Sequence, residues 1–129
     1  MSKRILVVDD DSHVLKYLVE ALSTAGYDTV AFDHYEEARL HLAAGRPDLL
    51  LTDVRLGPFN GLQLVLFARE KYHDVPVIVL TGYEDPTLRA EAVKFGAEFI
   101  VKPVRLEELL QRVAFALGGG KGTQPDQQQ

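Results

Sequence analysis

Reactive or ligating side chains stand at the ends of four apolar runs in this sequence. They are Asp9, Asp10 and Asp11 after the first run, Asp53 after the second, Thr81 at the end of the third and Lys102 after the fourth. Several carboxylates held close together repel one another and raise each other's pKa unless a cation lies among them. Because the set offers oxygen ligands and contains no Cys or His, a hard cation is expected, and Mg²⁺ fits best.

A divalent cation beside a carboxylate, a lysine and a hydroxyl forms a site that binds a phosphoryl group. Asp53 is the expected nucleophile of such a site, since aspartyl phosphate is an established kind of covalent intermediate. This chemistry requires that the four runs end at the same place in the fold.

The four runs have the composition of strands that are buried on both faces, as in a parallel sheet. They cover residues 5–8, 49–52, 75–81 and 99–101. Residues 27–32 form a weaker, partly alternating run, which predicts an edge strand or a half-buried strand.

Helical patterns separate these strands. Apolar residues recur at helical spacing over 14–22, 62–68 and 106–117. Asp33, with Glu36 three positions later, has the spacing of a capping box and predicts a helix that runs through Ala43. Asp85 before Pro86 predicts the start of a helix that reaches residue 95, and Asp11 is a better candidate for a helix cap than for a metal ligand.

The alternation of five strands with five helices predicts an α/β fold. We expect a doubly wound, parallel five-stranded sheet with helices on both faces. Ligands of such sheets bind outside the carboxyl ends of the strands. The polar residues of the four runs therefore converge at one edge of the sheet.

Length, composition and charge narrow the function. A chain of 129 residues is one domain on length alone, and the absence of cysteine excludes disulfides, zinc ribbons and thiol nucleophiles. The net charge of −5 argues against duplex DNA binding by this chain. No run is long enough to span a membrane and none resembles a signal peptide, so a cytoplasmic location is expected. Residues 118–129 are rich in Gly and Gln and predict a flexible tail or linker stub after a domain of residues 1–117.

Four segments carry a resemblance to a known family. They are ILVVDDD (5–11), LLLTDVRLGPFNGL (49–62), VIVLTGYE (77–84) and FIVKPV (99–104). Each is weak alone, but in this order and at this spacing they make residues 3–117 similar to a response-regulator receiver domain of two-component signalling, in the CheY-like superfamily. The resemblance implies a flavodoxin-like (βα)5 fold with strand order 2-1-3-4-5.

The resemblance also implies roles for the matching residues. Asp53 matches the phosphoacceptor, Lys102 the lysine that pairs with it, and Thr81 the hydroxyl that moves toward the phosphoryl group. The implied Mg²⁺ ligands are Asp9, Asp10, Asp53 and the backbone carbonyl of Arg55. Phe99 matches an aromatic residue whose rotamer follows the switch, and Gly61 matches the glycine that closes the loop after the phosphoacceptor strand.

Several positions bear on how closely the family pattern applies. Arg55 and Tyr83 border the path of attacking water in this family, and we hypothesise that they tune the lifetime of the phosphoryl group. Gly57 stands where the family often has proline, and Val104 stands where phenylalanine is common. The segment 96–99 is one residue shorter than expected.

The implied function is a phosphorylation-dependent signalling switch. A sensor histidine kinase or phosphotransfer protein would supply the phosphoryl group. The face made by the fourth helix, fifth strand and fifth helix would then change its packing and control an output domain or a protein partner, and a phosphorylation-dependent homodimer is one possible form. The chain would catalyse only its own phosphorylation and dephosphorylation, so it is not expected to be an enzyme.

Three alternatives are weaker. Residues 9–13 resemble the opening of haloacid-dehalogenase-type phosphatases, with Asp9 as nucleophile, but His13 stands where Thr or Val is usual and Asp53 would have no role. A flavodoxin-like cofactor carrier is disfavoured because three aspartates would repel a phosphate. A phosphate-independent interaction module stays open. The four histidines show no metal-ligand spacing.

Overall fold

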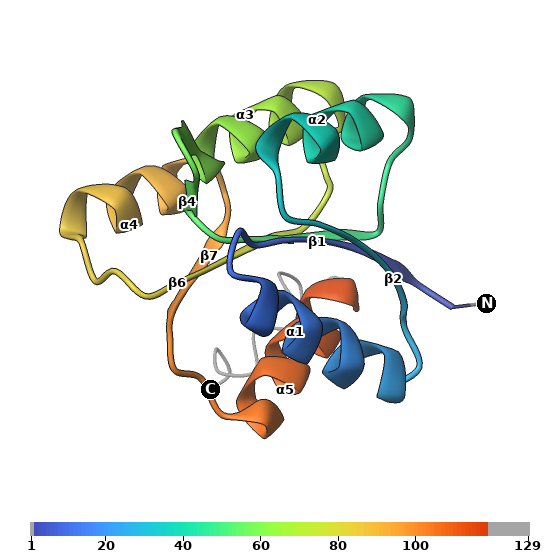
Figure 1. Ribbon diagram of the computed structural model, residues 1–129. Coiled ribbons are helices and arrows are strands. Elements are labelled where there is room, and N and C mark those ends of the chain that lie inside the picture. The colour runs from blue at the N-terminus through green and yellow to red at the C-terminus, as the bar shows by residue number, and fades with distance from the viewer. Residues whose placement is uncertain (1, 119–129) are drawn as a thin grey trace, which may run out of the picture.

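The computed structural model describes residues 2–118, and these residues build one parallel sheet covered on both faces by helices (Figure 1). The strands are β1 (Arg4–Val8), β2 (Asp28–Phe32), β3 (Leu49–Thr52), β6 (Val77–Thr81) and β7 (Glu98–Val101). They lie in the order β2-β1-β3-β6-β7, with every neighbouring pair parallel. Without the short strands β4 and β5 this is the order 2-1-3-4-5, so the predicted fold is confirmed.

The helices divide into two layers. Helices α1 (Ser12–Thr24) and α5 (Leu106–Leu117) cover one face of the sheet, and α2 (Tyr35–Ala44), α3 (Gly61–Lys71) and α4 (Pro86–Lys94) cover the other (Figure 1). Each face has its own hydrophobic core because side chains alternate along a strand. In β1, Ile5 and Val7 pack toward α1 and α5, whereas Leu6 and Val8 pack toward α2 and α3.

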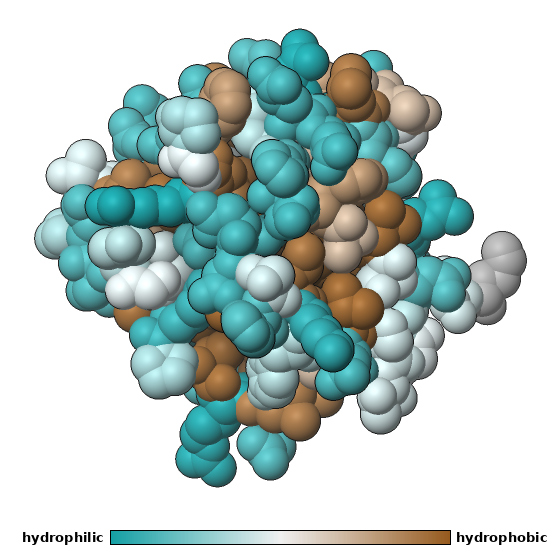
Figure 2. Space-filling view, viewed as in Figure 1, coloured by the Kyte–Doolittle hydropathy of each residue, from teal (hydrophilic) through white to brown (hydrophobic). Residues whose placement is uncertain are grey.

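The surface of the described residues is mainly hydrophilic in the view of Figure 2, with apolar side chains scattered among polar ones. None of the described helices combines the length and the hydropathy that a membrane crossing requires. The predicted tail, residues 118–129, falls outside the described residues apart from Gly118.

Two of the predicted helix starts are confirmed and one is wrong. Asp11 caps α1 by accepting hydrogen bonds from the amides of His13 and Val14, and Asp85 caps α4 in the same way. Helix α2 instead begins at Tyr35, so its cap is His34 and not the predicted Asp33. The Asp33 carboxylate is bound by the neighbouring His34 ring, with 2.7 Å between Oδ1 and Nδ1, and it makes no capping bond.

Residues 53–61 form a hairpin that the sequence pattern did not predict. Strands β4 (Arg55–Leu56) and β5 (Phe59–Asn60) pair antiparallel around a turn in which Gly57 has φ +65°. Two-residue strands are too short to show a hydrophobic period, so the sequence carried no signal for them. Asn60 ends the hairpin and caps α3 through a capping box with Gln63. The predicted strand of residues 75–81 also begins later, at Val77, because Pro76 has no amide to donate.

Candidate functional site

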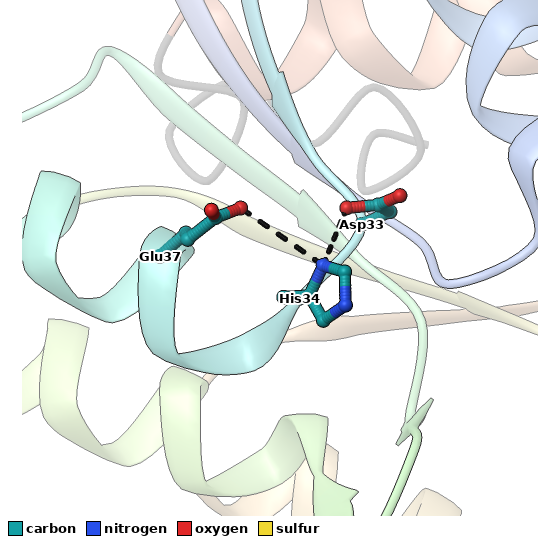
Figure 3. Close-up of side chains that lie close together, drawn as sticks. All are labelled: Asp33, His34 and Glu37. Atoms are coloured by element: carbon teal, nitrogen blue, oxygen red, sulfur yellow. Dashed lines mark hydrogen bonds and ion pairs between the residues drawn. The ribbon is translucent and has the colours of Figure 1, made fainter.

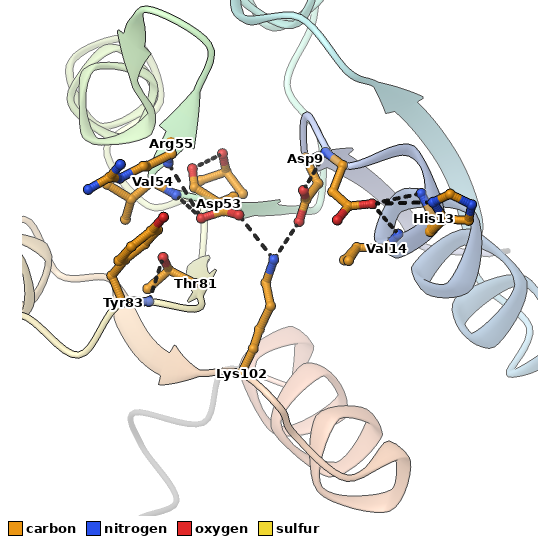
Figure 4. A network of polar contacts seen from close by, with 11 residues as sticks. Asp9, His13, Val14, Asp53, Val54, Arg55, Thr81, Tyr83 and Lys102 are labelled. Carbon is orange, nitrogen blue, oxygen red and sulfur yellow. Dashed lines mark hydrogen bonds and ion pairs between the residues drawn. The ribbon is translucent and has the colours of Figure 1, made fainter.

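Three of the predicted site residues meet at the carboxyl edge of the sheet (Figure 4). Asp9 follows β1, Asp53 follows β3 and Lys102 follows β7. The Lys102 Nζ donates to Asp9 Oδ2 at 2.9 Å and to Asp53 Oδ2 at 3.0 Å. Asp9 is 93 positions and Asp53 is 49 positions from Lys102 in sequence, so only the parallel order of the strands brings them together.

The lysine stays charged in this setting. Burial, the largest influence on Lys102, lowers its pKa, but the hydrogen bonds and the negative charges of Asp9 and Asp53 outweigh it and raise the pKa overall. A lysine with a raised pKa is a fixed positive charge at neutral pH. It can therefore neutralise negative charge that develops next to Asp53.

Asp9 is almost fully buried, with 1% of its surface exposed. Burial raises its pKa, and the charge of Asp53 adds to this effect. Hydrogen bonds from the Asp11 amide at 2.9 Å and from Lys102 act in the opposite direction without cancelling it. A carboxylate whose charged form is disfavoured by burial in this way is one that a further cation would stabilise.

Asp53 is oriented through both of its oxygens. Oδ1 accepts hydrogen bonds from the amides of Val54 at 2.6 Å and Arg55 at 3.4 Å, and Oδ2 accepts from Lys102. The Asp53 side chain keeps 10% of its surface exposed. The carboxylate is thus held in place by backbone and lysine while an approach from solvent stays open.

Asp10 completes a cluster of carboxylates that fits a hard cation. Its side chain is exposed, and its Oδ2 accepts from the amide of Gly57 in the hairpin at 3.1 Å. Asp9, Asp10 and Asp53 each offer an oxygen atom, and these atoms lie within 4.8 Å of one another. A set of oxygen donors of this kind suits Mg²⁺ and not a soft metal.

Thr81 and Tyr83 border the site on the side of β6. The Thr81 side chain is fully buried, and its Oγ1 accepts from the amide of Tyr83 at 3.3 Å. The Tyr83 ring is half exposed and stacks on the guanidinium of Arg55, with 3.9 Å from Cζ to the ring centroid. Arg55 and Tyr83 therefore lie together beside Asp53, as Figure 4 shows.

Comparison with known proteins decides the family. A family model for the response regulator receiver domain matches residues 5–114. This chain belongs to that family. The receiver domain is 39% identical over 114 residues to the response regulator MprA of Mycobacterium bovis, which covers 88% of this chain and 50% of MprA. It is 32% identical to the DNA-binding transcriptional regulator NtrC of Proteus hauseri, covering 88% of this chain and 24% of NtrC.

The receiver domain thus spans half or less of the length of these curated relatives. Its fold matches solved receiver domains over nearly all of their length. A CheY-like receiver domain protein from Methanospirillum hungatei has a TM-score of 0.89 at 27% identity, covering 95% of this chain and 98% of the other. The beryllofluoride-activated receiver domain of DrrB has a TM-score of 0.82 at 28% identity, covering 92% and 99%.

These matches identify the chain as a phosphorylation-dependent signalling switch. They give no support to a haloacid-dehalogenase-type phosphatase that uses Asp9 or to a phosphate-independent interaction module.

Phe99 lies in the core in this structure. It is 6% exposed and packs with the side chains between the sheet and helices α3 and α4. The guanidinium of Arg89 lies over its ring, 4.8 Å from the centroid. The sequence pattern pointed to Phe99 but not to Arg89, because nothing in a residue's spacing along α4 reveals a contact with β7.

A second group of possible metal ligands lies at the start of α2 (Figure 3). Asp33, His34 and Glu37 bring one ligand atom each within 4.8 Å of one another, although no metal spacing was predicted for the histidines. All three side chains are exposed, and His34 Nδ1 already bonds Asp33. Clusters of this kind are common on surfaces, so we assign it no role.

Proposed function

We propose that this receiver domain takes a phosphoryl group onto Asp53 from a sensor histidine kinase or a phosphotransfer protein. The observation that carries the proposal is the position of Lys102 Nζ between Asp9 and Asp53, at 2.9 and 3.0 Å, at the carboxyl edge of the sheet. A carboxylate nucleophile next to a fixed cation is the pairing that phosphoryl transfer to aspartate requires.

In the proposed reaction an oxygen of Asp53 attacks the phosphorus of a phosphohistidine. The O–P bond forms as the P–N bond breaks, and the imidazole leaves with the electron pair and takes up a proton. Lys102 neutralises negative charge on the transferred group and on Asp53. The amides of Val54 and Arg55 hold the Asp53 carboxylate in position during the attack.

Asp9, Asp10, Asp53 and the Arg55 carbonyl are the proposed ligands of Mg²⁺. When bound, this ion supplies positive charge that draws the phosphoryl oxygens toward Asp53. The support is the donor set itself, three carboxylates within reach of one another, one of them buried with a raised pKa.

Thr81 is the proposed sensor of the phosphoryl group. Its hydroxyl would leave the Tyr83 amide and donate to a phosphoryl oxygen, and the face formed by α4, β7 and α5 would repack in response. We propose that an output domain or a separate protein binds this face, and that phosphorylation can also pair two copies of this chain as a homodimer. This acidic chain itself is proposed to bind no nucleic acid. We further propose that the domain turns over no substrate besides its own aspartyl phosphate, and that it acts in the cytoplasm.

Intact mass after incubation with acetyl phosphate and Mg²⁺ tests the proposal. The parent protein should gain one phosphoryl group, and Asp53→Asn, which keeps the side-chain shape, should gain none. Asp9→Asn is the informative second variant, because a phosphatase-like site would lose its label there. Labelling that survives Asp53→Asn but is lost in Asp9→Asn would show that the nucleophile is misassigned.

A further inference from the structure

Arg89 joins the segment after β6 to the buried side of β7. Its Nε and Nη2 donate to the two carboxylate oxygens of Glu84, at 3.3 and 3.2 Å. The same guanidinium lies 4.8 Å from the centroid of the Phe99 ring. Glu84 precedes α4, Arg89 stands in the first half of α4, and Phe99 belongs to β7. We call these three residues the Arg89 cluster.

The Arg89 cluster lies on the same face of the sheet as Thr81. Val79 pairs with Phe99, and Thr81 pairs with Val101, in the register of β6 and β7. Residues two apart in a strand point to the same face, so Thr81 shares the face on which Phe99 packs. The cluster therefore lies on the same face of the sheet as the residue proposed to sense the phosphoryl group, and its Phe99 pairs with Val79, two positions before Thr81.

Movement of Thr81 would disturb this cluster. Its hydroxyl now accepts from the Tyr83 amide at 3.3 Å, and turning toward Asp53 gives up that bond. The amide then has to change its partner, to another acceptor or to water, and this frees the segment that contains Tyr83 and Glu84 to shift. Helix α4 offers little resistance, since Ala92 is its one fully buried residue among those described. The contact between Glu84 and Arg89 then holds this segment to α4, and through the Arg89 guanidinium to the Phe99 ring.

We propose that the Arg89 cluster stabilises the resting arrangement of the switch and so opposes phosphoryl binding. Arg89 acts as a positioning residue, because it touches neither Asp53 nor the transferred group. This inference rests on the proposed function of Asp53 and Thr81. A contact made in only one of two arrangements lowers the affinity of every ligand that favours the other.

Binding of beryllofluoride in the presence of Mg²⁺, followed by fluorine NMR, tests the proposal. Arg89→Met keeps the aliphatic stem over Phe99 and removes the cation. We expect its Kd to fall about two- to fivefold, which corresponds to the free energy of an exposed cation–π contact or a surface ion pair. Glu84→Gln should lower the Kd in the same direction. The variant that carries both substitutions should have the same Kd as Arg89→Met alone, because Glu84 acts through Arg89.

Arg39→Met is the matched control. Arg39 is also an exposed helix arginine whose guanidinium lies over a phenylalanine ring, 5.1 Å from the Phe67 centroid, but it belongs to α2 and not to the site. Its Kd should equal that of the parent, although both variants should lose a similar, small amount of stability in urea. An Arg89→Met variant that binds no more tightly than Arg39→Met would overturn the role of Arg89 and leave the proposed function intact. A parent protein that binds no beryllofluoride, or an Asp53→Asn variant that still binds it, would contradict the proposed function itself.

Discussion

Replacement of Gly61 by alanine should destabilise the fold at the point where it holds Asp53. Gly61 is the first residue of α3, and its amide donates to the carbonyl of Val54 at 2.5 Å. A Cβ at this position would collide with the carbonyl oxygen of Asp53 and would lie 3.0 Å from the carbonyl carbon. These atoms belong to the backbone of the residue that follows β3, so they cannot rotate away as a side chain would.

The expected loss follows from these contacts. Overpacking against a rigid neighbour costs about 1–3 kcal/mol, and weakening the Gly61–Val54 hydrogen bond costs about 1 kcal/mol. The helix propensity of alanine returns up to about 1 kcal/mol. We expect a net loss of about 2 kcal/mol, or on the order of 8 °C in Tm for a domain of this size. Acetyl phosphate labelling should slow as well, because the displaced carbonyl belongs to Asp53.

Urea unfolding followed by circular dichroism measures this loss, with Gly45→Ala as the control. Gly45 has an extended backbone at φ −173° and no atom within 4 Å of a built Cβ, so its replacement should leave stability unchanged or slightly raised. Ordinary surface substitutions change the free energy of unfolding by up to about 0.5 kcal/mol. If the free energies of unfolding of Gly61→Ala and Gly45→Ala differ by no more than this, the close approach of Gly61 to Asp53 does not constrain the fold.

Two further predictions concern the site itself. The folded state raises the pKa of Asp9 above 3.8, so it holds the proton to a higher pH than the unfolded chain. In metal-free buffer, ionisation of Asp9 therefore lowers the free energy of unfolding as the pH rises from 3.8 through the folded pKa. Over that range the Asp9→Asn variant should lose less stability than the parent protein. A difference between their urea midpoints that stays the same at every pH would contradict this. The Arg55–Tyr83 stack lies beside Asp53. Replacing both residues by alanine should admit water from that side and speed loss of the phosphoryl group a few-fold in a mass time course, while an unchanged rate would show that the stack has no part in that lifetime.

Local pattern was sufficient for the architecture and for naming Asp9, Asp53 and Lys102, the residues that the structure brings together at the carboxyl edge of the sheet. Apolar runs of strand length separated by helical spacing predicted five β-α units, and the residues that end those runs pointed to Asp9, Asp53, Thr81 and Lys102. This works because the hydrophobic period of each element is written in neighbouring residues. Parallel strands then bring their carboxyl ends to one edge whatever the details of packing.

The tertiary structure decided which side chains touch. The bridge from Lys102 to Asp9 and Asp53, the stack of Arg55 on Tyr83 and the cover of Phe99 by Arg89 join residues from different elements. The predicted start of α2 was also wrong, because the Asp33 carboxylate is bound to the His34 ring and accepts no hydrogen bond from the helix amides.

The difference has a physical cause. Secondary structure and strand ends depend on the spacing of residues along the chain, which the sequence states directly. Hydrogen-bond partners, burial and the resulting pKa shifts depend on how strands pair and how helices pack, and those relations exist only once distant segments have come together.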